Sequence, residues 1–144
     1  MKRVYTSLHI SAPPEALWAV LADFEHYPEW NPLIRSVQGS PGPGAKLRLT
    51  IARPDKSGEI GRMNVRIVEW KPRRALGWRG NLWPIFDGRH WFRLSPDRDG
   101  TLIEHGEDMR GIYPLILGKR GRARFAPYYQ ALNEALAKRL ADRP

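Results

Sequence analysis

From residue 46 to residue 109 the chain repeats one pattern, a segment of alternating apolar and polar side chains followed by a turn signal. The turn signals are GSPGPG at 39–44, PDKSG at 54–58, KPRR at 71–74, NLWP at 81–84 and PDRDG at 96–100. A period of two places the apolar side chains on one face of a strand, and short connections join neighbouring antiparallel strands. The pattern therefore predicts an antiparallel meander with one apolar and one polar face.

The segments before this meander predict a strand and two short helices. Apolar side chains alternate over about residues 3–10, as in a strand, and SAPPEALWAVLAD then has helical spacing. Proline lacks a backbone N–H and suits the first turn of a helix, so we expect the helix to begin at Pro13 or Pro14 rather than after a Ser11 cap. We interpret FEHYPEWNP, residues 24–32, as a rigid connection from the two helices to the second strand. We expect Tyr27 to brace the helices and Trp30 to pack inward.

Beyond Gly111 the period changes from two to that of an amphipathic helix. Its apolar face contains Phe125, Tyr129, Leu132, Leu136 and Leu140, and we place Gln130, Asn133, Lys138 and Arg139 on the opposite, polar face. Pro127 removes one backbone hydrogen bond, so we expect a kink or a boundary near it. A sheet with one apolar face needs a cover, and this helix is the one large apolar helical surface that remains. We therefore expect the sheet to curl around it.

Composition favours one soluble domain over residues 1–144. The hydrophobic content of 42% excludes a disordered chain, and no apolar run approaches the ~20 residues that span a bilayer. The chain has no cysteine, which excludes disulfides, thiolate metal sites and cysteine nucleophiles, and we expect a cytoplasmic protein.

The net charge of +9 is unevenly distributed. Residues 119–144 contain seven basic and two acidic side chains, so over half of the excess lies in this terminal segment. A basic surface suggests an anionic partner, and the sequence has no recognised nucleic-acid motif that would favour DNA or RNA.

These motifs together resemble the START-like, or SRPBCC, superfamily and in particular its bacterial polyketide cyclase/dehydrase-like members. The matching residues are Ala12-Pro13, Trp18, Asp23, the run Tyr27–Pro32, Trp78, Phe86, Gly88, His90, Phe92, Thr101, His105, Glu107, Gly111 and the run Asn133–Leu136. The resemblance covers nearly the whole chain. It implies an α+β helix-grip fold, in which a seven-stranded antiparallel curved sheet wraps around a long C-terminal helix and encloses an apolar cavity.

The resemblance leads us to expect a ligand cavity between the sheet and the C-terminal helix. Large aromatic rings suit the walls of such a pocket, although the same rings could fill the core completely. The expected lining residues are Trp30, Trp78, Phe86, His90, Phe92, His105, Glu107, Met109, Phe125, Tyr129, Leu132 and Leu136.

Three polar residues on the inward faces of the strands are candidates for chemistry. His105 and Glu107 alternate onto one side of a strand, about 7 Å apart, and His90 belongs to the neighbouring strand. A histidine beside a carboxylate could act as a general acid–base pair, orient a bound carbonyl or hydroxyl, or form a structural hydrogen bond. The three could also form a zinc site, but their spacing matches no close-spaced metal motif, so we expect no metal and no cofactor.

The segment GKRGRAR, residues 118–124, is a candidate anion or partner site. It contains Lys119, Arg120, Arg122 and Arg124, which we place near the beginning of the last helix, where the helix dipole disfavours cations. Solvent and salt could screen these charges, or an anionic lipid, a membrane surface or an acidic partner could bind them.

Three functions therefore remain open at the level of sequence. The first is binding or carriage of a small hydrophobic molecule, such as a lipid, a polyketide-like aromatic or an isoprenoid. The second is a cyclase, aromatase or dehydratase that uses His/Glu acid–base chemistry. The third is an interaction module that presents the basic C-terminal surface.

Overall fold

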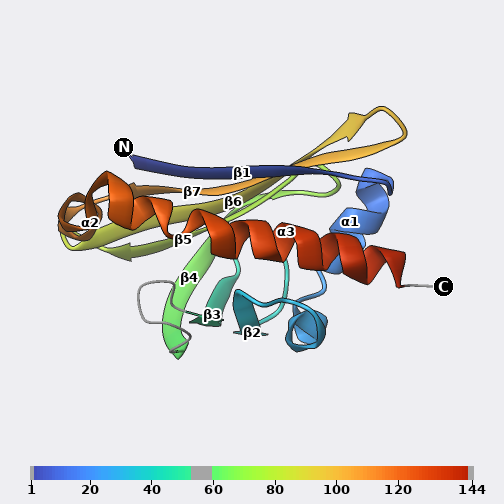
Figure 1. The fold of residues 1–144 in the computed structure, drawn as a ribbon. Helices are drawn as coiled ribbons and strands as arrows, with labels where there is room; N and C mark the ends of the chain where they lie inside the picture. Colours follow the sequence, from blue (N-terminus) through green and yellow to red (C-terminus); the bar gives the residue numbers. More distant parts are fainter. Residues whose placement is uncertain (1, 53–59, 143–144) are drawn as a thin grey trace.

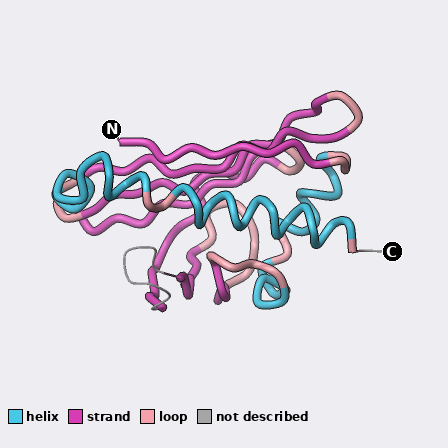
Figure 2. Tube along the Cα trace, in the orientation of Figure 1, coloured by secondary structure: helices cyan, strands magenta, loops and turns pink. Residues whose placement is uncertain are grey.

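The computed structural model describes residues 2–52 and 60–142 as a curved sheet with helices on its concave side (Figures 1 and 2). The elements in chain order are β1 (Lys2–Ile10), α1 (Pro14–Leu21), the 3₁₀ helix η1 (Phe24–Glu29), β2 (Ile34–Gln38), β3 (Lys46–Ala52), β4 (Ile60–Lys71), β5 (Ala75–Leu82), β6 (Phe86–Asp97), β7 (Gly100–Arg110), α2 (Ile112–Ala123) and α3 (Ala126–Ala141).

The sheet has seven antiparallel strands in the order β1-β7-β6-β5-β4-β3-β2. Strands β2 to β7 follow one another as a meander, and the first strand then pairs with the last. The long helix α3 runs across the sheet in Figure 1. The predicted fold class, with its curled sheet and C-terminal helix, is confirmed.

The helix α1 begins where the prolines predict. Pro13 has extended backbone angles and Pro14 is the first helical residue, while Leu17, Val20 and Leu21 are buried on one face. A proline in the first turn loses no intrahelical hydrogen bond, so the sequence tolerates both.

The interpretation of residues 24–32 as a connection is wrong in part, because residues 24–29 form η1 itself. Tyr27 lies in η1, is fully buried, and donates its hydroxyl to the carbonyl oxygen of Leu21 at the end of α1. This hydrogen bond joins the two short helices, as predicted for Tyr27. Asn31 then accepts hydrogen bonds from the N–H groups of Leu33 and Ile34 and turns the chain into β2.

The C-terminal segment contains two helices instead of one. Pro127 lies in the first turn of α3, so the expected boundary falls just before it. The preceding helix, α2, is interrupted at Gly118, whose backbone angles are φ 67° and ψ 179°. Glycine adopts positive φ without steric cost, which lets the chain change direction within α2.

The core lies between the concave face of the sheet and α1, η1 and α3. Alternate strand residues point into it, and the predicted inward face of β7 is confirmed by the burial of Ile103, His105 and Met109. The α3 residues Leu132 and Leu136 are fully buried against this face. The predicted apolar stripe of the helix is therefore the cover that the sheet needs.

Candidate functional site

A connected set of polar side chains lies inside this apolar core, between β6 and β7 on one side and α3 on the other. The antiparallel register pairs His90 with Glu107 and Phe92 with His105, which brings the three candidate acid–base residues together as predicted. His105 is fully buried, and the side chains of His90 and Glu107 are 7% and 14% exposed.

The buried end of this set is fixed by Asn133 of α3. The Asn133 amide group donates a hydrogen bond to Thr6 Oγ1 in β1 (2.9 Å), and its Oδ1 lies 3.0 Å from His105 Nδ1. Thr6 in turn donates to the backbone carbonyl oxygen of His105 (2.7 Å). Because Asn133 Oδ1 can only accept, His105 Nδ1 carries a hydrogen and His105 Nε2 is left as an acceptor when the ring is neutral.

His90 occupies the next position in the set. Its Nε2 lies 2.6 Å from Nε2 of His105, so His90 donates its Nε2 hydrogen to the neutral ring of His105. Burial is the main cause that lowers the pKa of His105 well below 6.5, and the positive charge of a protonated His90 lowers it further. His105 therefore remains neutral and holds His90 in one orientation.

Glu107 and Tyr129 complete the more accessible end. His90 Nδ1 lies 3.6 Å from Glu107 Oε1, and the Tyr129 hydroxyl donates to Glu107 Oε2 (3.2 Å). Burial raises the pKa of Tyr129 well above 10, with a further contribution from the charge of Glu107, so the hydroxyl keeps its proton. With Nε2 directed at His105, His90 presents Nδ1 to the carboxyl group of Glu107.

Aromatic rings surround the polar set. The indole of Trp78 stacks on His90 with ring centroids 5.2 Å apart, and His105 stacks on both Phe92 (4.2 Å) and Tyr129 (4.9 Å). These ring contacts, together with the hydrogen bonds, fix the orientation of the two imidazole rings.

The residues predicted to line a cavity come together, but their side chains pack against one another. Trp78, His90, Phe92, His105, Met109, Phe125, Tyr129, Leu132 and Leu136 are buried, whereas Trp30, Phe86 and Glu107 are half-buried. Phe86 lies at the end of the sheet, where its ring contacts Tyr113 of α2. This arrangement corresponds to the alternative in which the aromatic rings fill the core.

Trp30 packs at the margin of the core, as predicted. Its ring meets Tyr27 edge-on at 5.4 Å, and its indole nitrogen is buried without a hydrogen-bond partner among the described residues. The side-chain nitrogen of the neighbouring Asn31 is also buried without a hydrogen-bond partner among the described residues. Arg89 Nε and Trp91 Nε1 are also buried without a partner among the described residues, so this feature is not confined to residues 30 and 31.

Two surface hollows lie outside this core. One, of about 730 Å³, contains Glu69, Arg73, Arg93 and Glu104, and the other, of about 530 Å³, contains Arg48 and Arg66. The residues predicted to line the cavity take no part in either hollow within the described part of the chain. The polar set and the surface hollows are therefore separate features.

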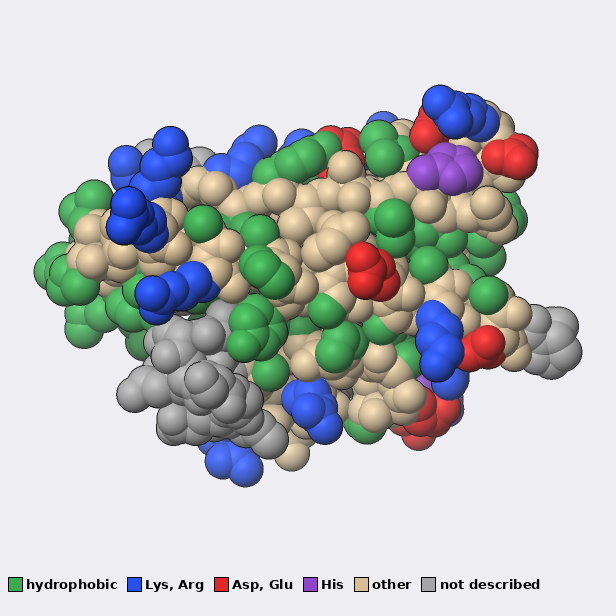
Figure 3. Space-filling view, in the orientation of Figure 1, with side chains coloured by type: hydrophobic (Ala, Val, Ile, Leu, Met, Phe, Trp, Pro, Cys, Tyr) green, Lys and Arg blue, Asp and Glu red, His purple; other side chains and the backbone are tan. Residues whose placement is uncertain are grey.

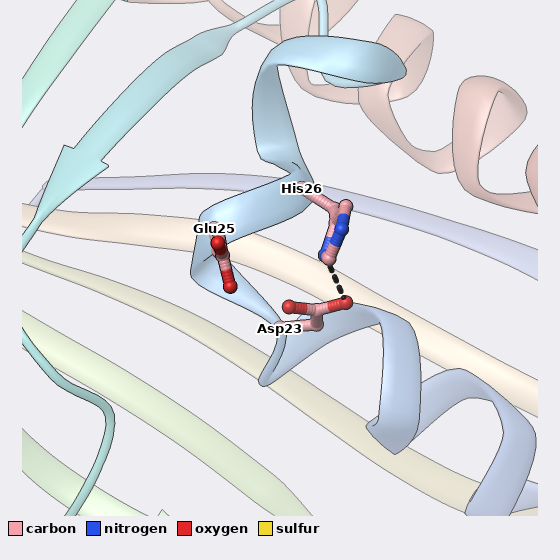
Figure 4. Close-up of side chains that lie close together, drawn as sticks. All are labelled: Asp23, Glu25 and His26. Atoms are coloured by element: carbon pink, nitrogen blue, oxygen red, sulfur yellow. Dashed lines mark hydrogen bonds and ion pairs between the residues drawn. The ribbon is translucent and has the colours of Figure 1, made fainter.

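Metal-ligating side chains gather at one place in residues 2–52 and 60–142, on the surface of η1. Asp23, Glu25 and His26 present atoms within 4.8 Å of one another, and His26 Nδ1 bonds Asp23 Oδ2 at 2.7 Å (Figure 4). This hydrogen bond raises the pKa of His26, which explains the contact without a metal. In the core, His90 Nε2 and His105 Nε2 lie 2.6 Å apart, closer than two nitrogens that ligate one tetrahedral zinc ion at about 2.0 Å each.

The basic segment 118–124 lies just before the last helix, α3, as predicted. It belongs to the second half of α2 and the link to α3, so Arg120 and Arg122 lie in the last turn of a helix, where the dipole favours cations. The expected unfavourable dipole interaction therefore does not apply to Arg120 and Arg122, whereas Arg124 lies two residues before the start of α3. Lys119, Arg120 and Arg124 are exposed, whereas Arg122 donates to the carbonyl oxygen of Pro114 (2.8 Å).

Sequence reasoning missed Asn133, which we had placed on the polar face of the last helix. The structure places it fully inside, where it bonds both β1 and β7. The signal was present in the helical spacing, because Asn133 follows Tyr129 by four residues and precedes Leu136 by three. Residues at these separations share a face of an α-helix.

The seven-stranded curled sheet around a C-terminal helix defines a protein of the helix-grip fold class. A START superfamily protein from Mycobacterium smegmatis has the same fold, with a TM-score of 0.77, 22% identity and coverage of 96% of this chain and 97% of that one. The Zhui aromatase/cyclase from Streptomyces sp. R1128 matches with a TM-score of 0.72 and 21% identity, over 99% of this chain and 94% of that one. These identities establish the shared fold alone.

Residues 1–141 match the family described as polyketide cyclase / dehydrase and lipid transport, and the chain belongs to this family. The predicted resemblance is therefore confirmed over almost the whole sequence. No curated protein sequence matches the chain. Within the described residues, no helix has the length and apolar character that a membrane crossing requires.

Proposed function

We propose that this protein binds a small hydrophobic molecule, such as a lipid, a polyketide-like aromatic or an isoprenoid, between its sheet and α3. The observation that carries the proposal is the graded burial of the polar set. Asn133 and His105 are fully buried and bonded to each other, whereas Glu107 at the other end retains some exposure. A ligand that enters at this end meets Glu107 first, beside the ring of Tyr129.

Affinity in such a site comes mainly from the burial of apolar surface, at about 25 cal/mol per Å². The His90–Glu107 contact and the Tyr129 hydroxyl would orient one carbonyl or hydroxyl group of the ligand. Because the rings fill the space in the closed structure, binding requires side chains at the accessible end to move aside. The half-buried Phe86 and the indole of Trp30, with its free N–H, are the residues that we expect to change contacts.

Native mass spectrometry of the protein purified from its natural host tests for a retained ligand. We expect an added mass that organic extraction removes, and we expect the extracted compound to raise the melting temperature of the stripped protein. Absence of any added mass, together with no shift of the melting temperature by lipid or aromatic extracts, would refute the proposal.

Two glutamates on β7 provide a matched pair of variants. Glu107 points inward, whereas Glu104 is on the outer face and accepts a hydrogen bond from Tyr5. We expect Glu107→Gln to change the affinity for the extracted ligand by about tenfold, the effect of one charge-assisted hydrogen bond, and Glu104→Gln to leave it unchanged. Equal effects of the two variants would contradict ligand contact at Glu107.

A second candidate function is polyketide cyclisation or dehydration, and the observation that favours it is the buried contact between His90 and Glu107. In an intramolecular aldol reaction, a base removes a proton from a carbon between two carbonyl groups. The resulting carbanion forms a C–C bond to the carbon of another carbonyl group, whose C=O π bond breaks as an acid protonates its oxygen to give the alcohol. His90 and Glu107, whose Nδ1 and Oε1 atoms lie 3.6 Å apart, would take these two roles, while His105 and Asn133 position His90. Loss of water from the resulting alcohol would complete a dehydration.

Turnover of a synthetic poly-β-ketone distinguishes this function from binding alone. If the protein is a cyclase, Glu107→Gln and His90→Gln abolish product formation at unchanged fold, as judged by circular dichroism. If it is a binder, product forms at the same rate with and without the protein, although the compound still raises the melting temperature.

A further inference from the structure

Six large apolar side chains are exposed together at the end of the molecule where α2 lies (Figures 1 and 3). We call this surface the apolar tip; it consists of Leu82, Trp83, Ile85, Ile112, Leu115 and Ile116. Their exposures range from 49% for Ile112 to 77% for Ile116. Among the described residues, two other large hydrophobic side chains are comparably exposed, Tyr5 and Val68, and they lie singly on strands. A cluster of this kind marks an interaction site more often than isolated exposed residues do.

The two segments that form the apolar tip are fixed to each other by the backbone. The N–H of Ile112 donates to the carbonyl oxygen of Pro84 (3.0 Å), and that of Tyr113 donates to Ile85 (2.9 Å). Gly111 permits this approach, because a Cβ there would lie 2.7 Å from the Ile85 oxygen and 2.8 Å from that of Pro84. The β5–β6 turn and the start of α2 therefore form one convex surface.

Basic side chains border the apolar tip, and acidic ones are nearly absent from it. Between Met109 and Asn133 the sequence has five basic residues and no Asp or Glu; the basic residues are Arg110, Lys119, Arg120, Arg122 and Arg124. The Arg110 guanidinium lies over the Trp83 ring at 5.3 Å. The nearest acid in the turn, Asp87, is buried and ion-paired with both Arg79 and Arg110, so this group of three keeps a positive charge.

We propose that the apolar tip and its basic border dock the protein on the surface of an anionic phospholipid bilayer. Leu115, Ile116 and Trp83 project far enough to enter the interfacial region, where tryptophan is favoured. The Lys and Arg side chains would lie at the level of the phosphates, each strengthening the attraction to a negative surface. A second copy of the chain fits less well, because it would bring two basic borders together.

Docking at this end would bring the candidate ligand site close to the bilayer. Glu107 precedes Arg110 by three residues on β7, a distance of about 10 Å along the strand. The docking proposal nevertheless rests on the surface alone and holds whether or not the core binds a ligand.

Co-sedimentation with vesicles tests whether the apolar tip contributes to membrane binding. We expect the protein to bind vesicles of phosphatidylcholine with added phosphatidylglycerol and not vesicles of phosphatidylcholine alone, and to dissociate as salt is raised. Leu115→Ser/Ile116→Ser should weaken binding by at least about tenfold, because two apolar side chains no longer enter the interface. The control Val68→Ser, at an exposed apolar residue of β4, should bind like the unmodified protein.

Two double variants that lower the net charge by the same amount test the contribution of the basic border to vesicle binding. Lys119→Glu/Arg120→Glu, in the basic border, should abolish binding to the anionic vesicles. Arg35→Glu/Arg74→Glu, which changes exposed residues in β2 and in the β4–β5 turn, should weaken it by less than about threefold, because salt screens distant charges. Circular dichroism and the melting temperature check that each variant is folded.

Three results would overturn the proposal. The first is equal binding to the neutral and anionic vesicles, and the second is unchanged binding after Leu115→Ser/Ile116→Ser. The third is a dimer in light scattering that the same substitutions convert to a monomer, which would assign the apolar tip to a second copy of the chain.

Discussion

Replacement of Asn133 by leucine probes the connection between α3 and the sheet. Leucine has nearly the shape of asparagine but no polar atoms, so the change removes hydrogen bonds while leaving little empty volume. In the Asn133→Leu variant the Nδ1 hydrogen of His105 loses its acceptor in a fully buried position. Thr6 Oγ1 loses a donor, although it still donates to the His105 carbonyl oxygen.

The expected loss follows from the cost of an unsatisfied buried donor, about 1–3 kcal/mol. Burial of an apolar side chain offsets part of this loss, so we expect the free energy of unfolding to fall by about 2 kcal/mol. Urea unfolding followed by circular dichroism measures it, best at a pH above 7, where His105 is neutral in both states. Glu134→Leu, at the next and exposed position of α3, is the control and should change stability by less than about 0.5 kcal/mol.

A double-mutant cycle with His105→Leu isolates the contact itself. When both partners are apolar, neither leaves the other unpaired, and the loss of the His90 contact is common to His105→Leu and the double variant. The double variant should therefore be more stable than the sum of the single losses predicts, by about 1–2 kcal/mol. Additivity within about 0.5 kcal/mol would refute the account of Asn133 as the partner of His105.

Two further predictions concern pH and Trp30. The pKa of His105 is lowered in the folded protein, so the unfolded state binds a proton first as the pH falls. The contribution of His105 to the free energy of unfolding is therefore fully present above pH 6.5. It decreases below that pH, by at most about 1.4 kcal/mol per pH unit. Chemical denaturation between pH 8 and pH 5 should show this slope, and His105→Leu should flatten it; an unchanged slope in that variant would assign it to another group. Trp30→Ala should destabilise the fold by about 2–3 kcal/mol, measured by urea unfolding. Weaker ligand binding by this variant, compared with an equally destabilised variant of another core residue, would show that the indole contacts the ligand.

The periodicity of the sequence was sufficient to predict most of the fold. Strand alternation predicted the meander, and the helical stripe that includes Leu132 and Leu136 predicted the cover of the sheet. The position of Pro127 predicted the start of α3. Each of these features depends on local spacing, which the sequence carries directly.

The errors arose where a tertiary contact overrides a local preference. Asn133 is polar, and polarity alone assigns it to the outer face of a helix, but hydrogen bonds to two strands that lie far away in sequence make its burial favourable. Similarly, Gly118 separates the basic segment from the apolar start of α2 by a turn that only the three-dimensional backbone reveals. The resemblance to START-like proteins led us to expect an open cavity, whereas the openness of a core depends on side-chain rotamers.

The pairing of the first strand with the last has a consequence for the order of folding. β1 is synthesised well before its partner β7, which ends at Arg110, and the Asn133 amide that bonds Thr6 lies 127 residues after Thr6 in the chain. Contacts of such long range form slowly, because a large loop must close before they contribute. The native sheet can therefore be completed only after β7 has been synthesised, and until then β1 has an unpaired edge of the kind that favours aggregation.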